Sequence, residues 1–291
     1  MLRPGGPRHQ RKAAIAANCD TTEPRRKTLK SIAQSVGVVL WIVLAGCGGP
    51  SGFSVEDHRL VDLSYTFDET TLYWPTDQRF FHNRVAWGMT PGGYWYSSYQ
   101  YGGSEHGGTH LDAPIHFGEG RRTVDELPLD QLIAPGVVID IAKQCETDPD
   151  YLLSVADLEA HEREQGAIAP GSIVLVRTGC GRFWPDAKQY LGSDTPGDTA
   201  NLRFPGVSPE AARLLAERRV ALVGIDTASI DRGASRDFQA HQVFGAANIG
   251  CLENVANLDQ LPTRGFTIIA LPMKIGQGSG APCRVVAMVR R

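Results

Sequence analysis

Three histidines and a carboxylate lie within eleven residues, in the segment His106-Gly-Gly-Thr-His110-Leu-Asp112-Ala-Pro-Ile-His116. Its two glycines and its proline disfavour a helix, so the segment is expected to be extended. Alternate residues of an extended chain point to one side, which places His106, His110 and Asp112 on the same face. The Cα atoms of His110 and Asp112 would lie roughly 6.6 Å apart, within reach of one ion. The segment therefore predicts a metal site, because ligands this dense are unusual in an ordinary polar loop.

The same segment has the form H-x-G-T-H-x-D-x-P-x-H and resembles the signature of the metal-dependent cyclase family, which includes bacterial kynurenine formamidase and isatin hydrolase. Other similar blocks are residues 224–231, His241, residues 253–258 and the loop 276–282. The likeness extends from about residue 60 to residue 289. It implies a single α/β domain with a β-rich, barrel-like core of the swivelling β/β/α type, flanking helices, and usually a homodimer.

The resemblance also implies the set of metal ligands. Two residues far along the chain join the three from the first segment, so the expected ligands are His106, His110, Asp112, His241 and Glu253. One five-coordinate ion and two ions bridged by Asp112 are both compatible with this set. Manganese or zinc is the expected divalent metal.

His116 is the expected general base and acid. It follows Pro114, which should redirect the chain away from the ligand face. An imidazole titrates near neutral pH, so it can take a proton from water and deliver it to a departing nitrogen. A sixth metal ligand is the alternative role, and the two differ in whether a His116→Ala variant keeps its metal.

The expected reaction is hydrolysis of a C–N bond, other than a peptide bond, in a small cyclic amide of the isatin type, by a metal-activated hydroxide with a histidine proton shuttle. An arylformamide such as N-formylkynurenine and a lactone are the alternatives within the same chemistry. A non-catalytic metal-binding or ligand-binding lipoprotein is the alternative from another class, and the presence of all six candidate positions argues against it. The resemblance further implies that the aromatic substrate lies beside Trp74, Phe80 and Phe204.

Supporting roles are open on sequence alone. Asp226 and Asp231 follow an apolar run, where either could hold a ligand imidazole in one tautomer or cap a turn. The loop 276–280 could present backbone N–H groups to a carboxylate or form a plain turn. The many aromatic residues between positions 73 and 99 could line a pocket, although most are expected in the core.

The N-terminus predicts export. Residues 1–46 combine basic side chains with a ten-residue apolar run, 36–45. This run is too short to span a bilayer, because a spanning helix needs about 20 residues. Residues 44–47 resemble a lipobox, so Cys47 is the expected lipidation site, residues 47–56 the tether, and residues 57–291 the catalytic domain. An uncleaved signal anchor is the alternative. The expected location is the cell envelope, on the periplasmic side or at the outer membrane, with membrane contact only through the lipid.

Charge and periodicity limit the remaining choices. Residues 1–46 hold eight of the 29 Lys and Arg and two of the 32 Asp and Glu, so the rest carries a formal net charge of −9 and disfavours nucleic acid as a partner. Short apolar runs predict strands at 60–65, 136–141, 172–178, 220–225, 267–271 and 284–289. Helices are expected after Ser154, ending near Gly166, and after Ser208, ending near Arg219.

Overall fold

All six strands expected from the short apolar runs are present in the computed structural model, which describes residues 54–291. They are β1 (His58–Asp62), β5 (Ile133–Asp140), β7 (Ile173–Arg177), β9 (Leu222–Ile225), β11 (Phe266–Pro272) and β12 (Gly280–Arg290). The sequence did not predict β4 (His110–Asp112), β10 (Gly250–Glu253), β6 (Leu152–Leu153), β8 (Gly206–Val207), β2 (Phe81–Met89) or β3 (Trp95–Gly102).

The main sheet closes into a barrel. Its strand order is β1-β12-β11-β5-β7-β9-β10-β4, and β4 also pairs with β12. The long β12 makes this closure possible, because its first residues pair with β4 while its last residues pair with β1. Strands β5, β7, β9 and β10 run parallel, and the other neighbours are antiparallel. The structure confirms the expected α/β class with a barrel-like core.

Both faces of the central strands are buried, which explains their continuous apolar sequences. In β7, Ile173 and Leu175 belong to one core cluster with residues of β11 and β12, while Val174 and Val176 belong to a second cluster. The second cluster includes Leu158 and Leu215 from the covering helices. A strand packed on both sides carries no polar alternation, as the sequence indicated.

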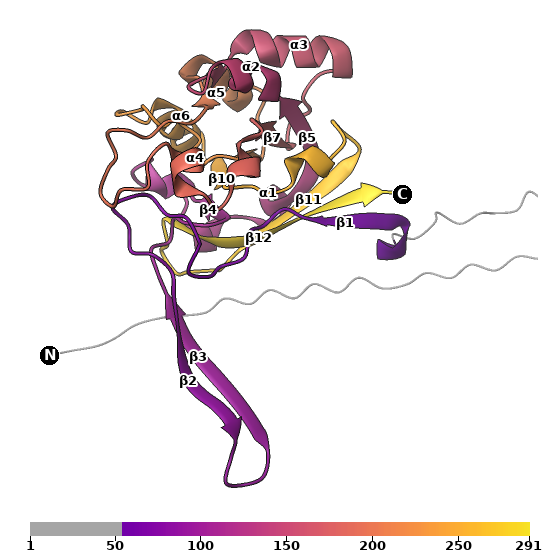
Figure 1. Ribbon diagram of the computed structural model, residues 1–291. Coiled ribbons are helices and arrows are strands. Elements are labelled where there is room, and N and C mark those ends of the chain that lie inside the picture. The colour runs from indigo at the N-terminus through magenta and orange to yellow at the C-terminus, as the bar shows by residue number, and fades with distance from the viewer. Residues whose placement is uncertain (1–53) are drawn as a thin grey trace, which may run out of the picture. The chain divides into compact units, whose positions relative to one another are not determined.

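The helices gather on one side of the barrel, where α2, α3, α5 and α6 lie close together (Figure 1). The six α-helices within residues 54–291 are α1 (Leu129–Leu132), α2 (Ala142–Thr147), α3 (Val155–Gln165), α4 (Ala187–Leu191), α5 (Pro209–Glu217) and α6 (Gln239–Ala246). The expected boundaries of two helices are confirmed. Ser154 caps α3 in a capping box with Asp157, and Ser208 caps α5 directly before Pro209.

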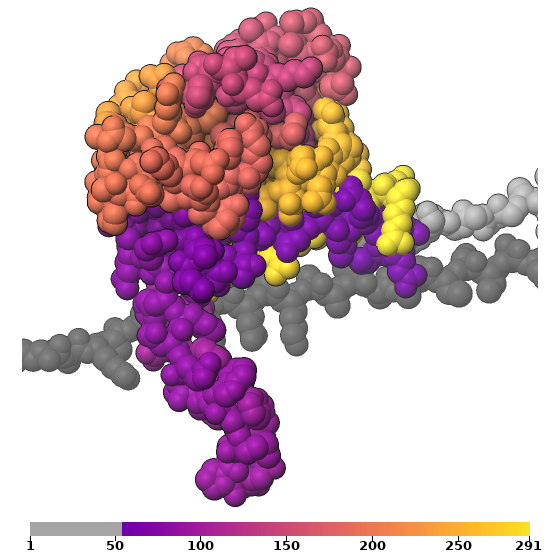
Figure 2. Space-filling model, in the orientation of Figure 1, coloured from indigo at the N-terminus to yellow at the C-terminus, as the bar shows by residue number. Residues whose placement is uncertain are grey.

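Strands β2 and β3 form a two-stranded hairpin that projects from the side opposite the helices (Figure 1). The space-filling view shows the hairpin standing clear of the barrel (Figure 2). Most aromatic residues between positions 73 and 99 are therefore not in the core. The exposed ones are Phe81, Trp87, Tyr94, Trp95 and Tyr96. The expectation of mostly buried aromatics was wrong, because no residue of β2 or β3 is buried by the rest of the chain between residues 54 and 291.

The expected leader, residues 1–46, lies outside the described residues, as do Cys47 and the tether as far as residue 53. The tether's last residues form a short 3-10 helix, Val55–Asp57. Between residues 54 and 291 no helix is both long and apolar enough to cross a bilayer. Cys145, Cys180, Cys251 and Cys283 are free thiols.

Candidate metal centre

Two neighbouring strands carry three of the expected ligands. In the antiparallel pairing of β4 with β10, Glu253 lies opposite His110, and Asp112 is two residues further along β4. His110 and Asp112 therefore share a face, as the alternation of an extended chain predicted. These three side chains are only 2–4% exposed. The barrel thus supplies a rigid, buried base for the site.

The other two expected ligands reach the same point from outside the strands. His241 lies in α6, and its Nε2 is 3.1 Å from Asp112 Oδ2 and 3.2 Å from Glu253 Oε1. His106 precedes β4, and its Nδ1 is 2.6 Å from Asp112 Oδ1. His110 Nε2 is 3.1 Å from Asp112 Oδ1 and 3.4 Å from Glu253 Oε2. The structure brings the other four predicted ligands together around the fifth, Asp112.

These residues fit a divalent cation. Nε2 of His110 is buried and, although it lies 3.1 Å from Asp112 Oδ1, it makes no well-aligned hydrogen bond among the described residues, which is costly unless something else binds it. Donor atoms bound to one ion at about 2.0–2.2 Å lie roughly 3 Å apart, close to the spacing seen here. Two buried carboxylates, Asp112 and Glu253, also face each other across the site and need positive charge between them.

The electrostatics agree with a site that gathers cations. Burial alone would raise the pKa of Asp112, but His106 and His110 hold it well below its ordinary value. Burial opposes the charged form of His110, yet attraction to Asp112 and Glu253 outweighs it and raises its pKa to about 9. Burial and the neighbouring Asp112 raise the pKa of Glu253. The pKa of His241 is raised as well, so without an ion protons on His110 and His241 supply positive charge beside these carboxylates.

Two of the imidazoles are held in one tautomer by acceptors behind them. His110 Nδ1 lies 2.9 Å from the carbonyl oxygen of Gly108, which can only accept a hydrogen bond. His241 Nδ1 lies 2.7 Å from Asp231 Oδ2. Both side chains therefore direct Nε2 at the carboxylates, as ligating histidines do. Of the two candidate supporting acids, Asp231 has this role, whereas Asp226 accepts hydrogen bonds from Thr178 and Gly179.

His116 is the last residue of the short 3-10 turn Pro114–His116. Its ring stacks on His106 with centroids 3.8 Å apart. One ring nitrogen of His116 lies within 4.8 Å of ligand atoms of His106 and Asp112, so these three form a second ligand group beside that of His110, Asp112 and Glu253. The geometry therefore suits both roles that the sequence left open for His116.

A cavity of about 280 Å³ opens above the ligands, lined by His116, His241 and Glu253 among others. Trp74 lines it, as expected. Phe117 and Phe238 complete the aromatic wall, and Phe117 lies 4.5 Å from the His241 ring, centroid to centroid. Sequence reasoning missed both, although Phe117 directly follows His116 and Phe238 stands three residues before His241.

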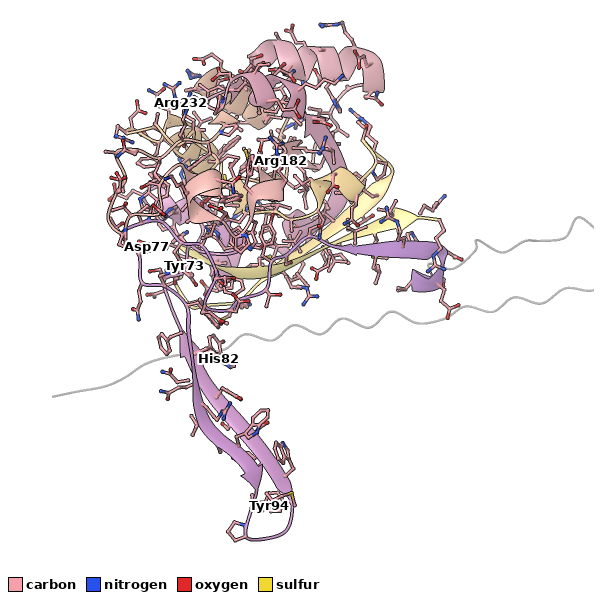
Figure 3. All side chains as sticks on the ribbon, in the orientation of Figure 1. Tyr73, Asp77, His82, Tyr94, Arg182 and Arg232 are labelled. Atoms are coloured by element: carbon pink, nitrogen blue, oxygen red, sulfur yellow. The ribbon has the colours of Figure 1, made fainter. Side chains whose placement is uncertain are left out.

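Two expected substrate contacts do not line this cavity. Phe204 is 1% exposed and packs with Leu72 and Tyr190 in a separate core cluster. Phe80 lies at the base of the hairpin, where its ring contacts Phe67 and Tyr101. The sequence also missed Asp77, which lines the cavity and lies beside Tyr73 near the base of the hairpin (Figure 3).

The glycine-rich loop 276–280 hydrogen-bonds to a side chain of the same chain. The backbone N–H groups of Ser279 and Gly280 donate to Glu105 Oε2 at 2.9 and 3.2 Å. A Cβ atom at position 280 would lie 2.5 Å from His106 Cε1, so only glycine leaves room for that imidazole. The loop presents its N–H groups to a carboxylate, the chain's own Glu105, and leaves room for the His106 ring.

Residues 61–232 match the Cyclase family. The isatin hydrolase of Roseibium aggregatum is 36% identical over 193 residues, which are 64% of this chain and 72% of that protein. The kynurenine formamidase of Salinibacter ruber is 31% identical over 236 residues, 78% of this chain and 96% of that protein. The crystal structure of an isatin hydrolase bound to the product analogue thioisatinate has a TM-score of 0.75 and 30% identity, covering 81% of this chain and 94% of that one. With its family match, its relatives and its barrel in agreement, the chain belongs to the cyclase family.

Proposed function

We propose that this protein is a metal-dependent amidohydrolase that cleaves a C–N bond in a small cyclic amide of the isatin type. The observation that carries the proposal is a set of three histidines and two carboxylates, all buried except the half-buried His106, at the base of an aromatic-walled cavity. The similarity to isatin hydrolases in sequence and in structure supports the choice of a cyclic amide.

We assign metal binding to His106, His110, Asp112, His241 and Glu253, with manganese or zinc as the ion. His110, Asp112 and Glu253 would hold one ion, and Asp112 with His106 would offer ligand atoms for a second. When bound, a divalent ion supplies Lewis-acid chemistry, because it lowers the pKa of water and polarises a carbonyl group.

His116 handles the proton in this mechanism. Loss of water around its packed face, together with the imidazoles of His106 and His241, lowers its pKa, although the nearby Asp112 opposes this effect. The ring is therefore neutral at pH 7, and a free nitrogen can accept the proton of the attacking water. The same nitrogen then returns the proton to the amide nitrogen as the C–N bond breaks, so the amine leaves uncharged.

The aromatic wall positions the substrate. Trp74, Phe117 and Phe238 offer flat apolar surfaces to a planar ring, and the Trp74 and Phe238 rings meet edge to face with centroids 6.0 Å apart. The cavity, at about 280 Å³, lies just below the usual range of about 300–1,000 Å³ for ligand sites, which suits a small substrate.

An arylformamide is the second candidate substrate, because kynurenine formamidases are also among the relatives. It requires the same ligands and the same proton transfer at His116. Lactone hydrolysis uses the same attack on a carbonyl but releases an alcohol, which needs less help from an acid. A direct comparison of the three substrate types separates these candidates.

The test is ring opening of isatin, followed by its loss of absorbance, with the purified chain freed of metal and then reloaded with Mn(II) or Zn(II). We expect turnover only after reloading. A chain that binds metal but leaves isatin intact, while hydrolysing an arylformamide or a lactone, would reject the cyclic-amide proposal. A chain that binds no metal would reject the ligand assignment.

Two variants assign the role of His116. His116→Ala should retain bound metal and lose at least 100-fold in turnover, in line with the usual contribution of general acid–base catalysis of about 10²–10⁴-fold. Loss of metal in this variant would instead identify His116 as a ligand. His161→Ala, which removes an imidazole from α3 well away from the cavity, is the matched control.

We further propose that the protein is an exported lipoprotein of the cell envelope, anchored through Cys47, and that it forms a homodimer. The basic leader and short apolar run support export. The hairpin supports a second copy of the chain as partner, because an isolated two-stranded hairpin is marginally stable and this one exposes several large apolar side chains. Metabolic labelling with a fatty acid, compared between the native chain and a Cys47→Ser variant, tests the anchor.

A further inference from the structure

Glu105 and Ser279 form a hydrogen-bonded pair directly behind His106. Glu105 Oε2 lies 2.6 Å from Ser279 Oγ, and Ser279 Oγ lies 2.9 Å from His106 Nε2. Ser279 is fixed by its backbone as well, because its N–H donates to the same carboxylate and its carbonyl accepts the N–H of Ala113. Neither Glu105 nor Ser279 is among the expected ligands.

The direction of each hydrogen bond follows from the groups involved. An ionised carboxylate only accepts, so the single hydroxyl proton of Ser279 is donated to Glu105. The hydroxyl oxygen then has lone pairs but no proton left for His106. His106 Nε2 must therefore carry a proton and donate it to Ser279 Oγ, which leaves Nδ1 as the nitrogen that faces Asp112 at 2.6 Å.

The surroundings hold the imidazole in this orientation. Its Cε1 lies against Gly280, at a position where any other residue would place a Cβ 2.5 Å away. The His116 ring also stacks on it, with centroids 3.8 Å apart. A 180° flip of the ring would put carbon atoms where Nδ1 and Nε2 now lie and would break both hydrogen bonds. His106 thus differs from His110 and His241, which direct Nε2 at the carboxylates.

We propose that Glu105 and Ser279 are positioning residues that hold His106 in the tautomer protonated at Nε2, so that Nδ1 is its metal-binding atom. This inference rests on the proposed metal site but not on the identity of the substrate. Residues that orient ligating histidines typically contribute about 10–100-fold to metal affinity. The glycine-rich loop then has a defined task, since it carries Ser279 and leaves room for the ring.

The direct test is long-range ¹H–¹⁵N correlation spectroscopy of the full chain with ¹⁵N-labelled histidine, loaded with diamagnetic Zn(II). We expect His106 to show a protonated Nε2 and a metal-bound Nδ1, and His110 and His241 to show the reverse pattern. His106 bound through Nε2, or not bound at all while zinc is held by the other ligands, would overturn the proposal. This measurement needs no substitution, so it does not depend on a variant that folds.

Four variants test this relay of hydrogen bonds from Glu105 through Ser279 to His106. The quantity measured is metal affinity, by competition with a chromophoric chelator. Ser279→Ala removes the acceptor for His106, and Glu105→Ala frees the Ser279 hydroxyl to donate in the wrong direction; both should lose about 10–100-fold in affinity. Ser279→Thr and Glu105→Gln keep a hydroxyl and a carbonyl acceptor, so their affinity should stay close to that of the native chain. Asp130→Asn, an exposed carboxylate on α1, is the control.

The outcomes separate this proposal from the proposed function. Unchanged affinity in both alanine variants, or equal losses in the alanine and conservative variants, would reject the relay while leaving the hydrolase intact. Native affinity and the expected nitrogen pattern in a chain that hydrolyses no amide would support the relay and reject the hydrolase. Complete absence of bound zinc would reject both.

Discussion

At the residue scale, the site is organised by the groups that hold each imidazole from behind. Each imidazole has one ring nitrogen that points away from Asp112 and Glu253, and another group contacts that nitrogen. The groups are Gly108 for His110, Asp231 for His241 and Ser279 for His106. The backing groups differ, as a carbonyl, a carboxylate and a hydroxyl, but each determines which nitrogen faces the centre. This arrangement reduces the rearrangement that the site needs when an ion enters.

Asp231 offers the clearest test of this arrangement among the acidic side chains. It accepts hydrogen bonds from the backbone N–H groups of Ala240 and His241 as well as from the His241 imidazole. Asp231→Ala should lower metal affinity about 10–100-fold, because His241 loses its fixed tautomer. Equilibrium dialysis with metal analysis measures the change. Asp237→Ala, on the exposed side of the same turn, should bind metal as the native chain does.

Asp77 should influence which substrates enter. Its half-buried carboxylate lines the cavity, burial raises its pKa, and among residues 54–291 no Lys or Arg lines the same cavity. An anionic substrate therefore meets a negative group on the cavity wall that no lining Lys or Arg offsets, and only the proposed metal ion would attract it. Asp77→Asn should lower KM for an arylformamide that carries a carboxylate and leave KM for its neutral analogue nearly unchanged. Equal changes in both KM values would contradict an electrostatic role.

At the element scale, the hairpin of β2 and β3 stands out because it carries large apolar side chains that its surroundings leave exposed. Trp87, Trp95 and Tyr96 are each more than half exposed, and the Trp87 and Trp95 rings meet edge to face within the hairpin, with centroids 5.3 Å apart. Such a surface is unusual on a monomer and is typical of a contact with another chain.

Substitution of Trp87 and Trp95 by Ser tests the proposed dimer. Loss of two large aromatic contacts should shift the mass measured by light scattering from dimer towards monomer, because such residues often dominate interfaces. Leu129→Ser, an exposed apolar residue on α1, is the matched control and should leave the mass unchanged. A native chain that is monomeric at all concentrations would refute the proposal.

The sequence predicted those elements that their own residue pattern is enough to identify. Strands such as β7 and β9 appear as apolar runs because both of their faces are buried. Strands β4 and β10 were missed, since they are three and four residues long and carry the polar ligands. The hairpin was missed because its exposed apolar residues follow no alternation between buried and exposed faces.

The same distinction applies to the site. His106, His110 and Asp112 could be grouped from spacing alone, because a short extended segment fixes their relative positions. His241 lies 129 residues from Asp112, so only a family resemblance could connect them. Phe117 and Phe238 were missed because nothing local distinguishes an aromatic residue that lines a cavity from one in the core.

At the scale of the whole molecule, a metal ion and protons on the imidazoles would both supply positive charge to the same buried carboxylates, so we expect them to compete. In the metal-free chain the pKa of His110 is raised from its unfolded value near 6.5 to about 9, and that of His241 is raised as well. A group whose pKa is raised on folding contributes stability that is present below its unfolded pKa and is lost as pH rises towards its folded pKa. The metal-free chain should therefore lose stability between pH 6.5 and about 9.

Thermal denaturation of the metal-free chain across this pH window measures the effect. We expect Tm to fall as pH rises, and the fall to be smaller in the metal-loaded chain, where the ion replaces the protons. His110→Gln should flatten the pH dependence of the metal-free chain, since it removes one of the titrating groups. A metal-free Tm that rises from pH 6.5 to 9 would contradict protonated imidazoles in the folded state.

The pairing of β4 with β12 closes the barrel, and β4 is also the strand that carries two of the proposed metal ligands. The proposed ligands come together only when residues from 106 to 253 have reached their final positions, so a chain with an open barrel has no complete site. We therefore expect complete metal coordination late in folding. For the same reason, the metal content of a sample that has been equilibrated with excess ion and then washed reports the fraction of chains whose barrel is closed.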